Sequence, residues 1–282
     1  MTSESPTIED PGKDPGVAHF ALGVEYDGSC FHGWQRQPGQ RSVQQTLEEA
    51  LSRVADAPIR ALAAGRTDAG VHATQQVVGF ATSAVRPARA WIRGVNSLMP
   101  DELRVRWVEP VPAHFHPRFS ATARRYLYVI VEADQAPAIA RQCVTWSARR
   151  LDDAAMHSAA QVLLGEHDFT SFRSAACQSR SPYRCIFSIA VRRFDDIVVV
   201  DITANAFLHH MVRNIAAALM QVGVGDREPQ WVGAALVARD RALVGPTAPP
   251  TGLYLVDVQY GAEFVFPRGR APMVLKAAGD VW

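Results

Sequence analysis

One short segment places a carboxylate where a catalytic site could be built. The segment GRTDAGVHA covers residues 65–73 and lies between a strand predicted near 59–64 and another near 75–81. Asp68 is therefore expected on a loop at a strand end, where the glycines of the segment permit tight backbone geometry. Arg66 can pair with Asp68 and keep its carboxylate ionised near neutral pH, so that it could act as a nucleophile or a base but not as an acid.

A structural interpretation of the same residues stays open at this point. In an ordinary turn, Asp68 would bond its own backbone and Arg66 would be a solvated charge. For an isolated segment of this composition, such a turn is the commoner outcome.

Tyr126 is a second candidate, because the segment ARRYLYVI at 123–130 presents it on a strand beside Arg124 and Arg125. A phenol on a cleft wall could stack on a base or move a proton. The commoner use of a strand tyrosine is aromatic packing against cross-strand neighbours.

The segment HDFTSFRSAACQSRSPYR at 167–184 mixes aromatic residues, small polar residues and arginines without a clear period, and it predicts a surface loop. Such a mixture suits contacts to an RNA backbone, although a solvated loop fits these residues equally well. Cys177 is disfavoured as a nucleophile, because no activating base is identifiable near it.

Paired histidines stand in the segment NAFLHHMVRNI at 205–215. At the start of a helix, His209 and His210 would point to different faces, and the i, i+4 spacing of helical metal ligands is absent. We therefore expect a core helix with His209, His210 and Arg213 on its exposed edge, and no metal site. Its apolar stripe is Phe207, Met211 and Ile215.

The periodicity of the chain predicts the same order of elements, β-α-β-β-α-β, twice. The first half has strands at 20–27, 59–64, 75–81 and 103–110, and helices at 41–57 and 88–98. The second half has strands at 121–132, 186–194, 197–207 and 253–260, and helices at 152–165, 209–223 and, as an insertion, 231–238. Ser42 and Gln45 are predicted to cap the helix at 41–57 as a capping box.

This pattern predicts an α+β protein of two ferredoxin-like halves, whose mostly antiparallel sheets join edge to edge around a central cleft. A proline-broken connection at 110–119 suggests the boundary. The predicted domains are a disordered acidic tail (1–17), an N-terminal domain (18–112), a C-terminal domain (113–262) and a C-terminal extension without an assigned role (263–282).

The composition is that of an ordinary globular chain of 282 residues with a net charge of +1. All its basic residues except Lys13 and Lys276 are arginines, and the stretch 104–150 carries a net charge of +5. Arginine suits phosphate and stacked-base contacts, so a polyanionic partner is compatible with the charge, although a compositional bias of the genome accounts for part of it.

Several classes are disfavoured by what the sequence lacks. It contains no Walker loop, GxGxxG or GxSxG motif, which argues against a nucleotide cofactor and a serine hydrolase. No apolar run is long enough to cross a membrane, and the first residues do not resemble a secretory signal. The four cysteines contain no CxxC pair, which suggests free thiols in a reducing compartment. We therefore expect a cytoplasmic protein.

Taken together, the motifs resemble the TruA family of tRNA pseudouridine synthases over about residues 20–260. The resemblance rests on six segments in order: YDGSCFHGWQRQ (26–37), GRTDAGVHA (65–73), FSATARRYLY (119–128), HDFTSFRSAACQSR (167–180), NAFLHHMVRNI (205–215) and TGLYLV (251–256). It implies the pseudouridine synthase fold and isomerisation of uridine to pseudouridine at positions 38, 39 and 40 of the tRNA anticodon stem-loop. It also implies no cofactor, and a homodimer with tRNA lying across both subunits.

The resemblance also implies roles for individual residues. Asp68 matches the essential aspartate, Arg66 an arginine that fills the space of the flipped nucleotide and pairs with the aspartate, and Tyr126 a tyrosine that stacks on the uracil and helps to remove the C5 proton. Leu253 matches an apolar residue of the pocket. RNA contacts are expected at Arg86, Arg118, Cys177, Gln178, Ser179 and Arg180.

Three alternatives remain at the level of sequence. An N-glycoside hydrolase would cleave the same bond, but it needs an activated water, for which the motifs offer no second carboxylate or metal. A non-catalytic tRNA chaperone would not need Asp68, Arg66 and Tyr126. A structural RNA-binding module is the third alternative, and the basic middle of the chain alone would support it.

Overall fold

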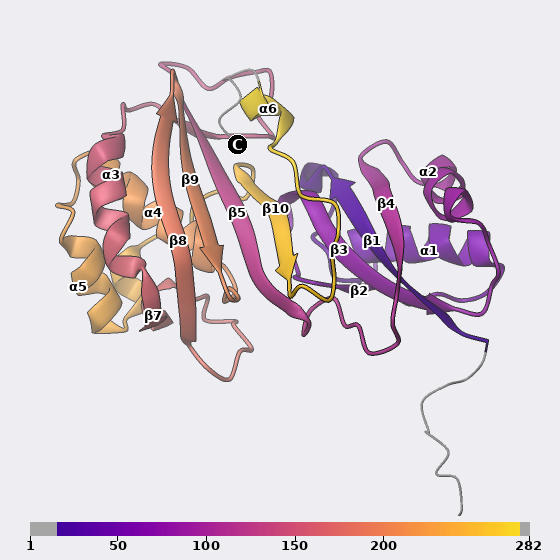
Figure 1. The fold of residues 1–282 in the computed structure, drawn as a ribbon. Helices are drawn as coiled ribbons and strands as arrows, with labels where there is room; N and C mark the ends of the chain where they lie inside the picture. Colours follow the sequence, from indigo (N-terminus) through magenta and orange to yellow (C-terminus); the bar gives the residue numbers. More distant parts are fainter. Residues whose placement is uncertain (1–15, 277–282) are drawn as a thin grey trace, which may run out of the picture.

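The structure is a computed structural model that describes residues 16–276 (Figure 1). Its N-terminal half contains β1 (Ala18–Tyr26), α1 (Val43–Ala55), β2 (Leu62–Ala63), β3 (His72–Thr82), a π-helical turn (Ala90–Gly94) leading into α2 (Val95–Leu98), and β4 (Leu103–Val111). The predicted tail lies almost wholly outside the described residues, as do residues 277–282 of the predicted extension.

The second half repeats the order with insertions. Its strands are β5 (Ala121–Glu132), β6 (Thr145–Ser147), β7 (Gly165–Asp168), β8 (Tyr183–Phe194), β9 (Ile197–Ala204) and β10 (Leu253–Tyr260). Its helices are α3 (Asp153–Ala160), α4 (Met211–Gly223), α5 (Trp231–Ala238) and α6 (Met273–Lys276). None of the helices within residues 16–276 has the length and apolarity needed to cross a membrane.

A single 10-stranded sheet runs through both halves in the order β4-β1-β3-β10-β5-β9-β8-β7, with β2 beside β3 and β6 beside β5. Its ladders are antiparallel except for two parallel pairs, β3 with β10 and β5 with β6. The halves meet in the first of these, where His72 pairs with Tyr254 and Ala73 with Leu255. The predicted α+β class, with mostly antiparallel half-sheets joined edge to edge, is confirmed.

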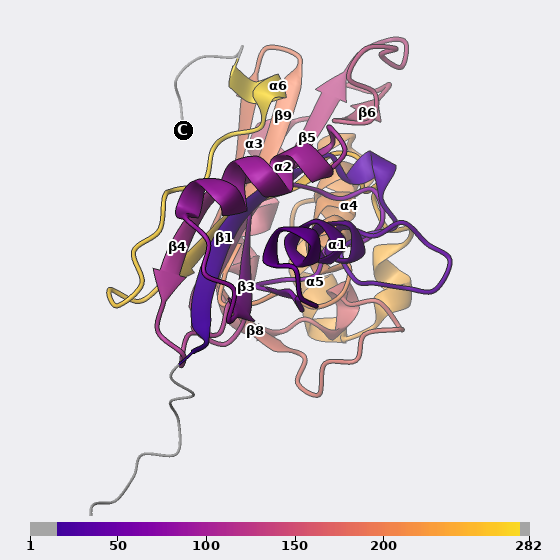
Figure 2. The same cartoon turned by 90° about the vertical axis from the view of Figure 1, so that its right-hand side faces the viewer.

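The two faces of this sheet are covered differently. Helices α1 and α4 lie on one side, and the C-terminal segment crosses the opposite side (Figure 2). There Phe266 stacks on Trp107 with ring centroids 5.2 Å apart, and Leu275 of α6 is fully buried. Residues 263–276 are therefore an integral part of the folded body. The predicted domain boundary between residues 112 and 113 stays a prediction, because one sheet contains the strands of both halves.

Several local predictions were wrong in detail. Ser42 does cap α1 by accepting a hydrogen bond from the backbone of Gln45 at 3.3 Å, but the Gln45 side chain bonds Glu49 rather than completing a capping box. The helix predicted at 152–165 ends as α3 at Ala160, and the short strand β6 had no recognisable period.

Candidate active site

A cavity of about 1050 Å³ opens where the two halves meet. The N-terminal half contributes residues 61–69, which include the loop that carries Asp68. The C-terminal half contributes residues 206–213, at the start of α4, together with Tyr126 of β5 and Leu253 of β10. The candidate site is therefore built by segments far apart in the sequence.

The loop before Asp68 is held by hydrogen bonds on both sides. The side-chain amide of Gln76, fully buried, donates to the carbonyl of Gly65 at 2.6 Å. The hydroxyls of Thr67 and Tyr26 are 2.8 Å apart, and the carbonyl of Thr67 accepts from the backbone of Trp34 at 3.0 Å. None of these bonds uses the Asp68 carboxylate, so the loop is fixed while this side chain remains available.

The two glycines of the loop have different roles. Gly70 has a φ of +78°, and a Cβ there would lie 2.8 Å from Pro250, so both backbone and space require glycine. Gly65 has no such φ, and a Cβ there would meet only the Tyr126 hydroxyl, at 3.7 Å. The tight turn is therefore at Gly70 alone.

The Asp68 carboxylate faces three nitrogen-bearing side chains of the C-terminal half. His209 Nε2 lies 3.3 Å from Oδ1, while His210 Nε2 and a terminal nitrogen of Arg213 each lie 3.4 Å from Oδ2. The Asp68 side chain is 26% exposed. This arrangement is not the ordinary turn in which an aspartate bonds its own backbone.

The predicted pair between Arg66 and Asp68 is not formed in this structure. Arg66 is exposed at the cavity, and within residues 16–276 the side chains in polar contact with the Asp68 carboxylate are His209, His210 and Arg213. The prediction relied on nearness in sequence, whereas the cation that approaches the carboxylate comes from α4.

His209 and His210 were expected on different helix faces, and that expectation was wrong because neither residue is helical. The helix α4 begins at Met211, and His210 precedes it in the left-handed region with a φ of 64°. The two rings consequently lie side by side, with centroids 4.0 Å apart and planes tilted by 40°, and both reach Asp68. Burial lowers the pKa of His210, and the positive side chain of Arg213 lowers it further, against the opposing effect of Asp68. His210 is therefore neutral near pH 7.

Arg213 was expected on an exposed edge, but its side chain is only 13% exposed. Its Nε donates to the carbonyl of Ala248 at 2.8 Å, which leaves a terminal nitrogen directed at Asp68. The guanidinium is thus held in place, and it balances the negative charge of the carboxylate.

Tyr126 lies on β5 with its ring edge-to-face against Phe207, at a centroid distance of 5.1 Å and an interplanar angle of 83°. The side chain is buried, and burial raises the pKa of Tyr126 well above its usual range. The phenol is consequently protonated at neutral pH, which suits stacking and hydrogen-bond donation better than proton removal.

Three possible metal ligands occur in the same cluster. One ligand atom each from Asp68, His209 and His210 lies within 4.8 Å of the others, a spacing that could hold a divalent cation. The guanidinium of Arg213 already approaches Asp68 Oδ2 at 3.4 Å, and its positive charge opposes a second cation at that oxygen.

The predicted RNA contacts divide into two groups. Arg118 and the run Cys177 to Ser179 line the cavity, whereas Arg86 and Arg180 do not; Leu253, predicted as an apolar residue of the pocket, also lines it. The Nε of Arg86 instead donates to the carbonyl of Val54 at 3.0 Å, near the end of α1.

Sequence reasoning missed the role of residues 209–213 in the site. A signal was present, because two histidines and an arginine stand within five positions of one another beside a predicted strand end. It became meaningful only when the fold brought Asp68 to them.

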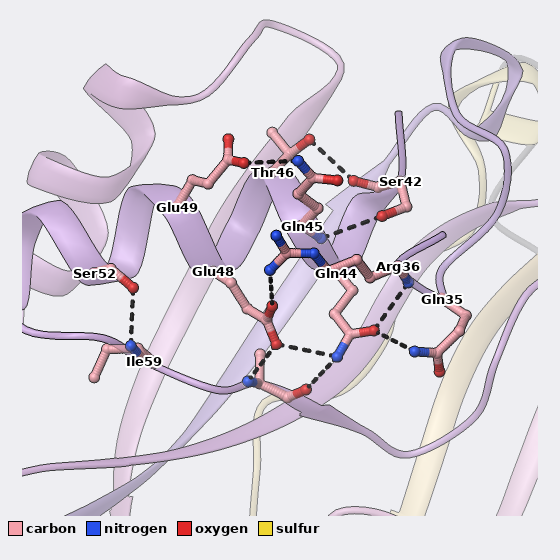
Figure 3. A network of polar contacts seen from close by, with 11 residues as sticks. Gln35, Arg36, Ser42, Gln44, Gln45, Thr46, Glu48, Glu49, Ser52 and Ile59 are labelled. Atoms are coloured by element: carbon pink, nitrogen blue, oxygen red, sulfur yellow. Dashed lines mark hydrogen bonds and ion pairs between the residues drawn. The ribbon is translucent and has the colours of Figure 1, made fainter. Parts of the chain in front are cut away.

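A second polar network fixes the start of the cavity-lining segment against α1 (Figure 3). Glu48 of α1 accepts hydrogen bonds from the backbone of Ala61 and from the side chain of Gln44, each at 3.0 Å. Gln44 also donates to the carbonyl of Ala61 at 3.2 Å and accepts from the side chain of Gln35 at 2.9 Å. The chain leading to Asp68 is therefore anchored on the helix.

Comparison with known proteins gives consistent matches. The family model described as tRNA pseudouridine synthase matches residues 23–120 and 159–261. The chain is 56% identical over 252 residues to the tRNA pseudouridine synthase A of Cronobacter sakazakii, covering 89% of this chain and 93% of that protein. It is 55% identical to that of Klebsiella pneumoniae, with the same coverages, and 53% identical to that of Escherichia coli, covering 91% of this chain and 95% of that protein.

A chain from the crystal structure of a Cbf5-Nop10-Gar1 complex is a distant structural match. Its TM-score is 0.30 at 14% identity, covering 71% of this chain and 45% of that chain. A score this low is no evidence of a common fold.

Proposed function

Because the chain belongs to the tRNA pseudouridine synthase family, we propose that it isomerises uridine to pseudouridine in tRNA, with Asp68 as the reacting carboxylate. One observation carries the assignment of the residue. Asp68 projects from a fixed loop into a cavity between the halves, and Arg213 approaches it from the opposite half at 3.4 Å.

The reaction explains why a carboxylate is needed there. The bond between C1′ and N1 of the nucleotide breaks, the uracil turns while bound, and C5 is joined to C1′; C5 loses a proton and N1 gains one. Positive character on the sugar is stabilised or trapped by an adjacent carboxylate. Attack at C1′, attack at C6 and removal of a 2′ proton all remain compatible with the position of Asp68.

The other cavity residues have supporting roles in this proposal. A base inside a helical stem must leave the stack before its C1′ is reachable. Arg66, exposed beside Asp68, takes the space that the flipped nucleotide leaves. Tyr126 stacks on the uracil against the apolar side chain of Leu253, and Arg118 with residues 177–179 contacts the RNA backbone. Arg86 and Arg180, outside the cavity lining, would contact more distant parts of the tRNA.

The finer part of the proposal concerns target and assembly. The six-segment resemblance supports uridines 38, 39 and 40 of the anticodon stem-loop as targets, a homodimer across which the tRNA lies, and action in the cytoplasm, where tRNA is. Substrates that carry uridine at only one of the three positions test the first point. Size-exclusion chromatography with light scattering tests the second.

The decisive experiment is tritium release from tRNA that carries [5-³H]uridine in the anticodon arm, with free uracil assayed in the same tubes. The wild type should release tritium without free uracil, and Asp68→Ala should release none while still binding tRNA. Asp134→Ala, which changes an exposed aspartate outside the cavity lining, is the matched control and should behave as the wild type. Free uracil would indicate a hydrolase, and absence of release by the wild type would indicate a chaperone.

A further inference from the structure

Two large apolar side chains of the cavity lining are left in solvent. Leu62 is 52% exposed and Phe119 is 76% exposed. A single exposed apolar residue needs no explanation, but a phenylalanine exposed on the wall of a substrate cavity has a ring face available to a ligand. Neither residue is used by the chemistry at Asp68.

Phe119 is flanked by one aromatic ring and one cation. The ring of His116 lies 4.3 Å from it, centroid to centroid, at an angle of 34°. The guanidinium carbon of Arg118 lies 5.6 Å from the Phe119 centroid. Since the side chain remains 76% exposed beside both neighbours, much of its surface is still free.

The turn that carries these side chains is fixed by its own hydrogen bonds. His116 Nδ1 accepts from the backbone of Arg118 at 3.1 Å and of Phe119 at 3.2 Å. The backbone of Ser120 donates to the carbonyl of His116 at 2.9 Å, and the Ser120 hydroxyl accepts from the His116 backbone at 3.1 Å. The exposed ring is therefore presented by an ordered turn, which reduces the entropy lost when a ligand stacks on it.

A buried arginine couples this turn to the catalytic loop. Arg124, 7% exposed, donates to the carbonyls of Arg118 at 2.6 Å, Ala64 at 3.0 Å and Asn205 at 2.9 Å. Ala64 immediately precedes the loop of Asp68, and Asn205 begins the segment that leads to α4. Arg124 therefore links the Phe119 turn to the start of the Asp68 loop and to the segment before α4.

We propose that Phe119, together with Arg118 and His116, forms a stacking platform for an unpaired nucleobase of the tRNA next to the target uridine. The proposal rests on the proposed function and adds a second base-binding position to it. Bases stack on exposed aromatic rings whatever their identity, and a neighbouring guanidinium attracts the adjoining phosphate. The cavity, at about 1050 Å³, is at the upper end of the range for sites that hold one small ligand, so it has room for more than the reacting nucleotide.

The test compares Phe119→Ala, Phe119→Leu and Phe119→Trp in binding and turnover of tRNA. Alanine and leucine should each weaken tRNA binding, and raise KM, by roughly tenfold, which lies within the range for loss of one base-stacking ring. Phe119→Trp should preserve the tRNA affinity and KM of the wild type. In all three variants kcat at saturating tRNA should stay within about threefold of wild type, because loss of the ring removes binding that ground state and transition state share. Phe187→Ala is the matched control: Phe187 is 55% exposed on β8 and does not line the cavity.

A direct readout uses an anticodon-arm RNA with 2-aminopurine on either side of the target uridine. Binding should quench one of the two probes in the wild type and in Phe119→Trp, and quench it less in Phe119→Ala and Phe119→Leu. Equal quenching in all variants would overturn the proposal. Equal tRNA binding by Phe119→Leu and the wild type would also overturn it. An apolar contact without ring stacking, as in a protein interface, would then suffice.

The test of the stacking platform can fail or succeed independently of the test of the proposed function. Phe119 is exposed, so its substitution removes little buried surface, and thermal unfolding checks each variant. If Phe119→Ala failed to fold, the difference in tRNA binding between Phe119→Leu and Phe119→Trp would decide. If the wild type made no pseudouridine, the proposed function would fail, whereas ring-dependent tRNA binding would still support the platform.

Discussion

Two carboxylates of the N-terminal half, Glu48 and Asp68, are held in opposite ways. Glu48 has a side chain only 10% exposed and accepts two hydrogen bonds of 3.0 Å, from partners at most 13 residues away (Figure 3). Asp68 is 26% exposed, and the nitrogen atoms that contact it lie at 3.3 to 3.4 Å, on residues more than 140 positions away. Oε1 of Glu48 thus accepts two hydrogen bonds of ordinary length, whereas both oxygens of Asp68 have only longer contacts.

The difference separates a structural carboxylate from a reactive one. The two hydrogen bonds on Oε1 of Glu48 tie α1 to the chain at Ala61. Arg213 balances the charge of Asp68, and all three contacts, from Arg213 and the two histidines, are too long to hold its oxygens tightly. A reacting carboxylate needs such a position, because it must form a new contact to the substrate.

Changing Asp68 to Glu should have the largest effect. The variant keeps the charge but moves it by one methylene, away from the position set by the fixed loop. We expect kcat to fall about 100-fold, because misplacement of a reacting group by about 1 Å costs this much. Single-turnover formation of pseudouridine measures the loss, and tRNA binding should remain within about threefold of wild type. Activity close to that of the wild type would mean that only charge is needed at this position.

Replacing Arg213 with Gln should have the next largest effect. The contact at 3.4 Å is long for a charged hydrogen bond, so we expect kcat/KM to fall roughly tenfold, the lower end of the range for such bonds. Arg149→Gln provides the control, since Arg149 forms an exposed ion pair with Asp226 at 2.8 Å, away from the cavity lining. If the two variants lost activity equally, the cation beside Asp68 would have no special role.

The contrast between local contacts at Glu48 and long-range contacts at Asp68 also explains what the sequence could and could not predict. Strands, helices and the repeated β-α-β-β-α-β order depend on periodicity over short segments, so they were recovered, apart from features such as β6 that are too short to have a period. The edge-to-edge joining of the halves followed from that order. The Ser42 cap was recovered for the same local reason.

The surroundings of Asp68 were not predictable in this way. The residue itself was found from its motif, but its partner was assigned to Arg66 because Arg66 is near in sequence. The cation that reaches the carboxylate is Arg213, which only the β3–β10 junction and the position of α4 bring close. His210 was misplaced because α4 begins at Met211, two residues after the predicted start at 209, and His210 precedes it with a left-handed φ of 64°.

Glu48→Ala should change stability rather than chemistry. It leaves the backbone N–H of Ala61 without its acceptor and removes one of the two acceptors of the Gln44 side chain, so we expect a loss of about 2 kcal/mol in the free energy of unfolding. Denaturant unfolding measures this loss, and kcat should stay within about threefold of wild type at temperatures where the variant is folded. Glu48→Gln, which keeps an acceptor oxygen, should lose less. A variant with full stability and poor turnover would place Glu48 in the catalytic machinery instead.

The smallest expected effect is a pH dependence of stability that comes from His210. Burial, His209, Arg213 and Arg241 lower its pKa from the ordinary value of 6.5, and Asp68 opposes them. The unfolded chain therefore binds this proton more readily than the folded one. The stability contribution of His210 is complete above pH 6.5 and is lost as the pH falls from 6.5 toward the folded pKa.

His210→Asn tests this linkage, because asparagine tolerates the left-handed φ but does not titrate. The difference in melting temperature between pH 7.5 and pH 5.5 should be smaller in this variant than in the wild type, while the two should agree more closely at pH 7.5. A larger difference in the variant would mean that His210 gains its proton on folding, as a partner in a charged pair with Asp68. The Asp68 carboxylate would then resemble that of Glu48 more closely than its contact distances suggest. A specific ion pair with His210 would neutralise it, rather than leave it available for the substrate.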